Sequence, residues 1–285
     1  MSPKTLDHFI ILVEPLEPAV AAYQRLGFHV QPIARHLSIG SSNAVIHLHH
    51  TYLELFTLGD APALFQDAYR PRLQAGPGLC HVSLDSQSLE ADQARLLAAG
   101  LQPGTIASAR RRMVHPEGRE DETQSSFMYC WREQHRYLSL FVSHHAKPET
   151  IFVDGHVNHT NGAQEVTRCV FQSEDPALDL PYFRTLYGRS ETDRTVDGFR
   201  FVGPRGEVSE VITPAAAAAR YGAAMPGPGL AGLGALPLAM HYRVNSMAQC
   251  EQHLRGAGLD AAAVGGSLVV PAAQACGVVT VFEAA

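Results

Sequence analysis

The hydrophobic pattern of the chain repeats one short unit four times. In the first unit, residues 9–13 form an apolar run of strand length, and residues 16–26 then carry apolar side chains at helical spacing until Gly27. Over residues 28–56 the apolar period falls from about 3.6 residues to about 2, which indicates a change from helix to sheet. The first unit is therefore predicted to contain a strand, a helix and three further strands.

The same order of elements begins again at three later points in the chain. Opening strands are predicted at residues 79–83, 166–170 and 239–243, and closing strands at residues 137–141, 207–212 and 277–283. The step from His8 to His81 is 81 − 8 = 73 residues, and the step from Arg168 to His241 is also 241 − 168 = 73 residues. Equal steps indicate one two-unit block that has been copied once, which divides the chain into domains at residues 1–150 and 151–285.

Composition and charge narrow the classes of function. The chain has 285 residues, of which 46% are hydrophobic and 18% charged, as is typical of a globular protein. Its net charge of −6 offers no basic surface for nucleic acid, and no apolar run reaches the roughly 18 residues of a membrane span. The five cysteines are widely spaced and the first residues lack a signal-peptide pattern, so we expect reduced thiols and a cytoplasmic location.

Four short motifs carry a resemblance to a known family. They are Leu6-Asp7-His8, Tyr23-x-x-Leu26-Gly27-Phe28, Ser42-Asn43-Ala44-Val45-Ile46 and Tyr52-Leu53-Glu54-Leu55. Together with the repeated unit they resemble the vicinal oxygen chelate superfamily, which includes glyoxalases, bleomycin-resistance proteins and extradiol dioxygenases. Within it, the chain is most similar to the bacterial glyoxalase-like domain proteins. The resemblance implies an α+β fold of four βαβββ modules, paired into two cupped mixed β-sheets.

In such modules a metal ion is held by the first and last strands of two paired units. The resemblance places these ligands at His8, Glu54 and His81, and it places a fourth position at Ser139. Two histidines and one carboxylate suit Fe(II) and also accept Mn, Co, Ni or Zn, with open positions for a substrate. We therefore expect one divalent metal here, with Glu54 also able to move a proton as a catalytic group.

The second block offers a weaker set of ligands. The resemblance places its equivalent positions at Arg168, Glu210 and His241, and an arginine cannot lose its proton to ligate a cation. Arg168 is instead expected to bind an anionic group of the substrate, which leaves Glu210 and His241 as a second, weaker metal site. The resembled pattern would put the remaining acid at Val281, whereas this chain has Glu283 on the same strand face.

Several positions keep two interpretations. Asn43 lies beside a turn, where it could bind substrate or form the turn, and Ser139 could bind substrate or pack in the core. His47 and His49 share a strand face and could flank the cavity or lie at the surface. Residues 107–123 carry many charges and could form a solvated hairpin tip or a lid over the substrate.

Two functions are compatible with these residues. The first is an enzyme whose divalent metal chelates neighbouring oxygens of a small molecule, as a lyase, isomerase or dioxygenase. The second is a metal-free protein that binds and sequesters a small molecule, which the serine at Ser139 and the arginine at Arg168 favour. In both cases we expect a small-molecule partner, and a second copy of the chain as the partner in a homodimer.

Overall fold

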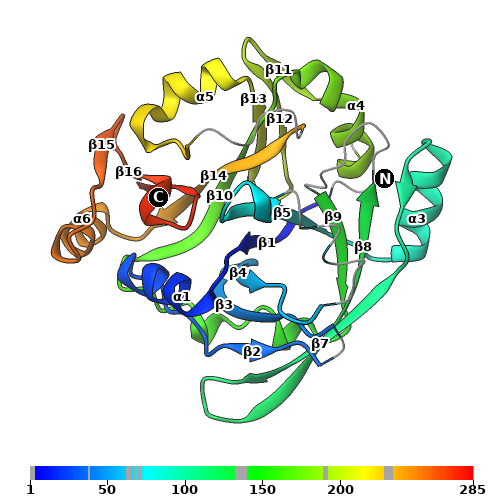
Figure 1. The fold of residues 1–285 in the computed structure, drawn as a ribbon, viewed down its shortest axis with the longest axis horizontal. Helices are drawn as coiled ribbons and strands as arrows, with labels where there is room; N and C mark the ends of the chain where they lie inside the picture. The colour runs from blue at the N-terminus through cyan, green and yellow to red at the C-terminus, as the bar shows by residue number, and fades with distance from the viewer. Residues whose placement is uncertain are drawn as a thin grey trace.

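The computed structural model describes residues 4–37, 39–61, 66, 69, 72–131, 140–188, 192–227 and 234–284. Two open mixed β-sheets lie side by side, with helices packed around them (Figure 1). This arrangement confirms the predicted α+β fold of paired βαβββ modules. No helix in the described part of the chain is long and apolar enough to cross a membrane.

The first sheet is built by the first half of the chain. Its strand order is β2-β3-β4-β1-β5-β9-β8-β6, and β7 pairs with β8 outside this path. Strand β1 runs parallel to β4 and antiparallel to β5, so the two units of the block meet at β1 and β5. The elements are β1 (Leu6–Leu12), α1 (Leu16–Arg25), β2 (Ala34–Arg35), β3 (Ser42–Leu48), β4 (Thr51–Thr57), β5 (Gly78–Asp85), α3 (Leu89–Ala98), β6 (Gln102–Pro103), β7 (Ala107–Val114), β8 (Glu120–Trp131) and β9 (Leu140–His145).

The second sheet repeats this plan in the second half of the chain. Its strand order is β11-β12-β13-β10-β14-β17-β16-β15, and its two units meet at β10 and β14. Two short 3-10 helices, η1 (Pro148–Thr150) and η2 (Asp154–His156), lie in the connection between the sheets. The elements are β10 (Ala163–Gln172), α4 (Pro176–Tyr187), β11 (Asp193–Thr195), β12 (Gly198–Val202), β13 (Val208–Ile212), α5 (Pro214–Tyr221), η3 (Gly222–Ala224), β14 (Leu236–Val244), α6 (Met247–Gly256), β15 (Ala262–Val264), β16 (Ser267–Val270), η4 (Ala272–Gln274) and β17 (Val279–Ala284).

Two helices of the second half of the chain begin at residues that commonly cap helices, and one of them also ends at such a residue. Asp175 caps α4 by accepting a 3.1 Å hydrogen bond from a backbone N–H in the first turn. Gly188 ends the same helix in the left-handed conformation, with φ at 67°, which glycine adopts without a steric penalty. Ser246 caps α6 in the same way as Asp175 caps α4, at 3.2 Å. Asp175 and Ser246 therefore fix where the two helices begin, and Gly188 fixes where α4 ends.

One hydrophobic core joins the two sheets. Phe9 of β1 points into it, together with Phe171 of β10 and Tyr242 of β14, and burial of such side chains is the main stabilising contribution. Helices α1 and α6 lie beside each other at one side of the molecule, and α3 and α4 at the other (Figure 1). Nε2 of His253 in α6 is 3.1 Å from the carbonyl oxygen of Arg25 in α1. The two halves of the chain are thus packed into one body.

The sheet faces that point away from this core differ between the two sheets. In the second sheet, Ala217 and Tyr221 of α5 pack onto that face against Val170. In the first sheet, the equivalent face carries His8 and Ile10, which alternate along β1 with residues of the shared core, and it borders a cavity. The copied blocks have therefore kept the same sheet and changed what lies on it.

A bulge in β1 changes the direction of one side chain. Where β1 pairs with β5, Leu6 lies opposite Leu84 and His8 lies opposite Ser83, so Asp7 has no partner of its own. Neighbouring residues of a regular strand point to opposite faces, but the extra residue of a bulge breaks this alternation. The side chains of Asp7 and His8 consequently lie in contact.

Two buried histidines tie the connection between the sheets to β3. His159 accepts a 2.9 Å hydrogen bond at Nδ1 from the backbone N–H of His29, and it donates a 2.8 Å bond from Nε2 to the carbonyl of His47. Nδ1 of His47 is 3.0 Å from the carbonyl oxygen of Ile151. Burial lowers the pKa of His47 to about 3 and the pKa of His159 to about 4. Both rings are therefore neutral near pH 7.

We expect acid to destabilise the fold through these histidines. Their pKa values in the folded protein lie below the value of about 6.5 in an unfolded chain, so between these values the unfolded state binds more protons. The stability that depends on the neutral rings is present above about pH 6.5 and is lost as the pH falls towards 4. For His159 we expect the free energy of unfolding to be about 2 kcal/mol lower at pH 4.5 than at pH 7.5. Urea unfolding at these two pH values measures the difference.

The variant His159→Asn separates this effect from general acid sensitivity. Because asparagine does not titrate, the pH dependence of the free energy of unfolding should shrink by about 2 kcal/mol in this variant. The exposed His50 provides the matched control, since His50→Asn should leave the pH dependence unchanged. An unchanged pH dependence in His159→Asn would contradict the role given to this ring.

Candidate functional site

A cavity of about 720 Å³, counting its open mouth, lies on the face of the first sheet that points away from the shared core. Side chains from β1, β3, β4, β7, β8 and β9 line it, so both units of the first block contribute. Its lining combines titratable groups with aromatic rings. The polar lining includes the titratable residues His8, His36, Glu54, Arg111 and His145 and the amide of Asn43, and the apolar lining includes Ile39, Phe56, Phe127, Tyr129 and Phe141.

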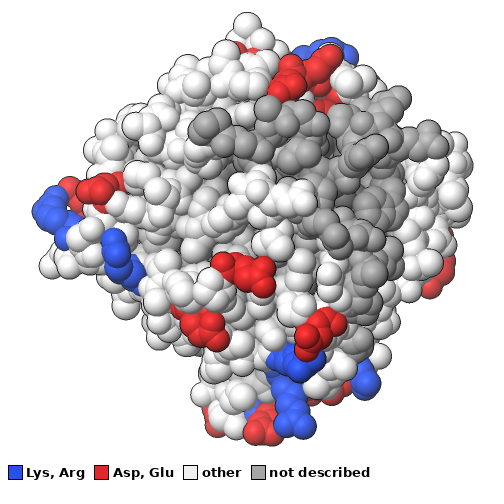
Figure 2. All heavy atoms as spheres, in the orientation of Figure 1, with Lys and Arg blue, Asp and Glu red and all other residues white. Residues whose placement is uncertain are grey.

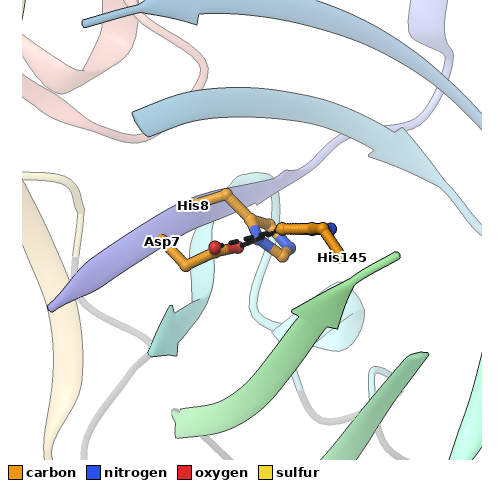
Figure 3. Close-up of side chains that lie close together, drawn as sticks. All are labelled: Asp7, His8 and His145. Carbon is orange, nitrogen blue, oxygen red and sulfur yellow. Dashed lines mark hydrogen bonds and ion pairs between the residues drawn. The ribbon is translucent and has the colours of Figure 1, made fainter. Parts of the chain in front are cut away.

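Asp7 holds two histidines at this cavity (Figure 3). Its carboxylate lies 2.5 Å from Nδ1 of His8 and 3.0 Å from Nε2 of His145, which is the last residue of β9. An ionised carboxylate only accepts hydrogen bonds, so each of these ring nitrogens donates its proton to Asp7. Nδ1 of His145 then accepts a 2.7 Å hydrogen bond from the hydroxyl of Ser125. The side chains of His8, Asp7, His145 and Ser125 thus form one hydrogen-bonded chain.

The charge of Asp7 fixes the state of His8. Burial by itself would raise the pKa of this carboxyl, but the charges and hydrogen bonds of His145 and His8 outweigh burial and hold the pKa well below its usual range. Asp7 is therefore ionised near pH 7 and keeps a proton on Nδ1 of His8. In the neutral ring, a proton held on Nδ1 leaves the lone pair on Nε2, the nitrogen of His8 that lies on the side of Glu54.

Glu54 of β4 lies close to His8 in the cavity wall. Its Oε2 is 3.9 Å from Nε2 of His8, which is too long for a hydrogen bond and leaves both atoms available to a ligand. Its Oε1 accepts a hydrogen bond from the amide of Asn43 and lies 3.5 Å from Nε2 of His36. Burial lowers the pKa of His36, although the charge of Glu54 acts in the opposite direction. Glu54 is thus held by the neutral amide of Asn43.

Asn43 both supports Glu54 and faces the cavity. Its amide nitrogen donates to Glu54 and lies 3.4 Å from Nε2 of His36. Its Oδ1 is buried and has no hydrogen-bond partner among the residues that the structure describes. A buried acceptor of this kind is costly unless a ligand donates to it, so Asn43 is suited to contact a bound hydroxyl or amino group.

His81 faces the same side of the sheet but is enclosed by aromatic rings. It is fully buried, and its ring centroid lies 4.5 Å from that of Tyr69 and 6.3 Å from that of Phe141. His8 packs against the same Phe141 ring at 5.1 Å. Within the described ranges, donor atoms gather as a group of three within 4.8 Å only at Asp7, His8 and His145. The structure thus brings His8 and Glu54 together without His81.

Strand pairing moves the fourth predicted position by two residues. In the first unit, Glu54 of β4 pairs with Ile10, which lies two residues after His8 in β1. In the second unit, the equivalent residue two places after His81 is Ser83, and it pairs with Phe141 of β9. An aromatic ring therefore occupies the place that the sequence repeat assigns to Ser139, which itself lies outside the described residues. A shift of two residues keeps side chains on the same face, so the hydrophobic pattern does not reveal it.

In the second sheet, the predicted ligands are engaged with other side chains. Glu210 accepts hydrogen bonds from Arg168 at 2.7 Å and from Arg220 of α5 at 2.7 and 3.0 Å. Burial would raise the pKa of Glu210, but the two arginines outweigh it and lower the pKa. His241 lies opposite Arg168, and its Nδ1 is 3.2 Å from Glu283. Glu210 is therefore part of an internal ion pair and is poorly placed to bind a metal cation. Arg168 is engaged in the same ion pair within the second sheet.

Three basic residues of the cavity lining lie outside the set expected from the sequence, namely His36, Arg111 and His145. Arg111 belongs to the charged stretch that forms the β7–β8 hairpin, where strand alternation buries it between two exposed arginines. His145 lies in the stretch expected to connect the domains, but β9 extends as far as this residue. His47 also lines the cavity, whereas His49 pairs with an exposed aspartate. Alternation along each strand is the signal that could have found Arg111.

We expect Asp7→Asn to lower the free energy of unfolding by about 3 kcal/mol at pH 7. An asparagine oxygen can accept from one histidine, but its amide group would then face the donor of the other. Denaturant unfolding measures the change. As a control, Asp60→Asn removes a carboxylate that is 85% exposed and pairs with Arg35, and it should cost less than about 0.5 kcal/mol. Similar small effects of both substitutions would refute the assigned role of Asp7.

Solved structures with the same fold share very little sequence with this chain. A hypothetical protein from Staphylococcus aureus has a TM-score of 0.66 and 9% identity, over 98% of this chain and 99% of that one. A xylose isomerase-like TIM barrel/4-hydroxyphenylpyruvate dioxygenase fusion protein has a TM-score of 0.56 and 10% identity, over 99% of this chain and 49% of that one. A mutant of 4-hydroxymandelate synthase from Streptomyces coelicolor has a TM-score of 0.55 and 10% identity, over 100% and 93%.

The family is shown by sequence rather than by these structures. A comparison with curated proteins gives no match, but the model of the glyoxalase-like domain family matches residues 6–180. That range is more than half of the chain and contains the whole first sheet with its cavity. The open sheets of βαβββ modules agree with it. The chain therefore belongs to the glyoxalase-like domain family and has the vicinal oxygen chelate fold.

Proposed function

We propose that this protein is a small-molecule enzyme that moves a proton on its substrate, as isomerases and lyases do, in the cavity of the first sheet. The hydrogen bond from His8 to Asp7 carries this proposal. An imidazole whose Nδ1–H is held by a carboxylate presents Nε2 as a base, and the carboxylate stabilises the imidazolium that forms. Membership of the glyoxalase-like family supports a small-molecule enzyme or binder without choosing the reaction.

Glu54 is the second acid–base group of this proposal. Two basic groups that lie close together suit a reaction in which one removes a proton and the other, already protonated, returns one. Glu54 lies 3.9 Å from His8 without a direct hydrogen bond, so a substrate could reach both groups. The buried Oδ1 of Asn43 would accept a hydrogen bond from the same substrate and so orient it.

A divalent metal at His8 and Glu54 is the second candidate. Their facing atoms are 3.9 Å apart, which two ligands with bonds of about 2.1 Å to one ion can span, and a carboxylate partner is typical of a metal-binding histidine. His81 would join them only by leaving its contacts with Tyr69 and Phe141, so the residues fit as two ligands rather than three. Such an ion, whether Fe, Mn, Co, Ni or Zn, would supply a Lewis acid for neighbouring substrate oxygens.

We expect His8→Gln to reduce turnover by at least about 100-fold, because glutamine cannot take up a proton. Proton NMR in D2O can follow hydrogen–deuterium exchange and conversion in a panel of small carbonyl compounds. Glu54→Gln should also lose activity, while His49→Gln, a surface histidine paired with Asp154, should behave as the native protein. Full activity in His8→Gln would disprove the proposal.

Metal analysis of the same purified variants separates the two candidates. Proton transfer by the side chains alone predicts activity that survives chelation, with no stoichiometric metal in the native protein. A stoichiometric divalent metal that is lost in both His8→Gln and Glu54→Gln, together with activity lost on chelation, would favour the metal-dependent enzyme. A native protein that binds compounds of the panel without converting any would favour sequestration and contradict both enzymatic candidates.

A further inference from the structure

We propose that the substrate of this cavity is a monocarboxylic acid with an apolar body, and that Arg111 binds its carboxylate. The inference deepens the proposed function, on which it rests, by naming the class of substrate for the same cavity. It is carried by one juxtaposition, a buried guanidinium and a group of aromatic rings that line the same space. Neither feature belongs to the acid–base pair of His8 and Glu54.

Pairing on both sides of β7 fixes the position of Arg111. It lies opposite Thr123 of β8, whose hydroxyl donates to the carbonyl of Arg111 at 3.3 Å, and it forms an isolated β-bridge with His36. Thr123 and His36 themselves line the cavity. Arg111 is only 7% exposed, while the side chain of Arg110 is 55% exposed, because successive strand residues point to opposite faces.

The charge of Arg111 is not matched by a nearby acid. In the described part of the chain, Arg110 pairs with Glu122 at 3.3 Å, but no carboxylate forms an ion pair with Arg111. The guanidinium of Arg111 donates a 3.4 Å hydrogen bond to the backbone carbonyl of Arg112, which uses one of its five N–H groups. On the face shown in Figure 2, by contrast, Lys and Arg side chains stand at the surface, several of them beside Asp or Glu.

A buried guanidinium of this kind is suited to a planar anion. Arginine keeps its proton in proteins, and a buried charge is costly unless hydrogen-bonded ionic partners surround it. Burial lowers the pKa of Arg111, while the more distant charge of Glu54 raises it. Glu54 is already bound by Asn43, so the remaining donors of Arg111 are available to a ligand. A carboxylate matches their fork geometry with two parallel hydrogen bonds.

The rest of the lining favours an apolar body on that acid. Phe127 and Tyr129 of β8 and Phe141 of β9 pack edge to face or tilted against one another, with ring centroids 5.7 to 6.3 Å apart. Phe56 of β4 and Ile39 add further apolar surface. A second anionic group would find no matching cation among the described lining residues, since Arg111 is the one lysine or arginine there. One carboxylate with an apolar remainder is the chemistry that this lining complements.

Binding of matched acids and amides tests the inference directly. The probes are benzoate, phenylacetate and 3-phenylpropanoate, each beside its neutral amide, titrated at pH 7.5 to millimolar concentration by isothermal titration calorimetry. For at least one pair, the native protein should bind the acid about tenfold more tightly than the amide, through charge-assisted hydrogen bonds to Arg111. Equal binding of acid and amide in every pair, or no binding of any acid, would overturn the inference.

Two arginine variants on the same strand sharpen this result. Arg111→Gln should lose the preference for the acid, and Arg111→Lys, which keeps the charge without the fork, should retain part of it. Arg110→Gln is the matched control on the solvent side and should keep the native preference. If Arg111→Gln kept the native preference for the acid over the amide, the inference would be contradicted. If the glutamine variant does not fold, Arg111→Lys is compared with the native protein in its place, and an unchanged preference would then contradict the inference.

The proposed function and the substrate class fail in different measurements. His8→Gln removes the proposed base but not Arg111, so its preference for the acid over the amide should equal that of the native protein. If turnover survives His8→Gln while the acid preference depends on Arg111, the proton-transfer proposal fails and the binding inference stands. If turnover depends on His8 while Arg111→Gln keeps the acid preference, the binding inference alone is wrong.

Discussion

The carboxylate of Asp7 is the group on which the candidate site depends. It is buried, it stays ionised because two imidazoles donate to it, and it lies at a bulge that turns it towards His8. A regular strand would place Asp7 and His8 on opposite faces of the sheet, and His8 would then lack a partner for Nδ1. The bulge therefore links a local backbone irregularity to the protonation state of a cavity residue.

The two blocks of the chain show how one fold can be used in two ways. In the first block, the face that points away from the shared core keeps a cavity with His8, Glu54 and Arg111. In the second block, α5 packs on that face and its Arg220 joins Arg168 in binding Glu210. The family model, which ends at residue 180, covers the whole of the first sheet and only the beginning of the second.

The fold could be predicted from the sequence because it depends on periodicity. The change from a period of about 3.6 residues to about 2 marked the end of each helix, and the helix predicted over residues 16–26 agrees with α1 (Leu16–Arg25). The family resemblance also predicts that His8 and Glu54 lie together, and both line one cavity because their strands, β1 and β4, are neighbours in the sheet.

The rest of the site depends on features that periodicity does not record. A two-residue register shift preserves the alternation of faces, and a bulge breaks that alternation at a place that the hydrophobic pattern does not mark. Neither the contact of Asp7 with His8 nor the place of Phe141 could therefore be read from the pattern. Arg111 stood in a charged run that is typical of a solvated hairpin. Alternation places it on the strand face of Met113, but its burial follows only from the pairing of β7 on both edges. The ends of strands, here His145, are similarly set by pairing.

The protonation state of His8 is the central claim of this account, and nitrogen-15 NMR of the histidine rings measures it most directly. With the protein labelled at both ring nitrogens and the His8 signals assigned by their absence in His8→Gln, long-range ¹H–¹⁵N correlations distinguish the two neutral tautomers. The account predicts a proton on Nδ1 of His8 and a lone pair on Nε2 near pH 7, because Asp7 accepts from Nδ1. A His8 ring with its single proton on Nε2 would contradict it.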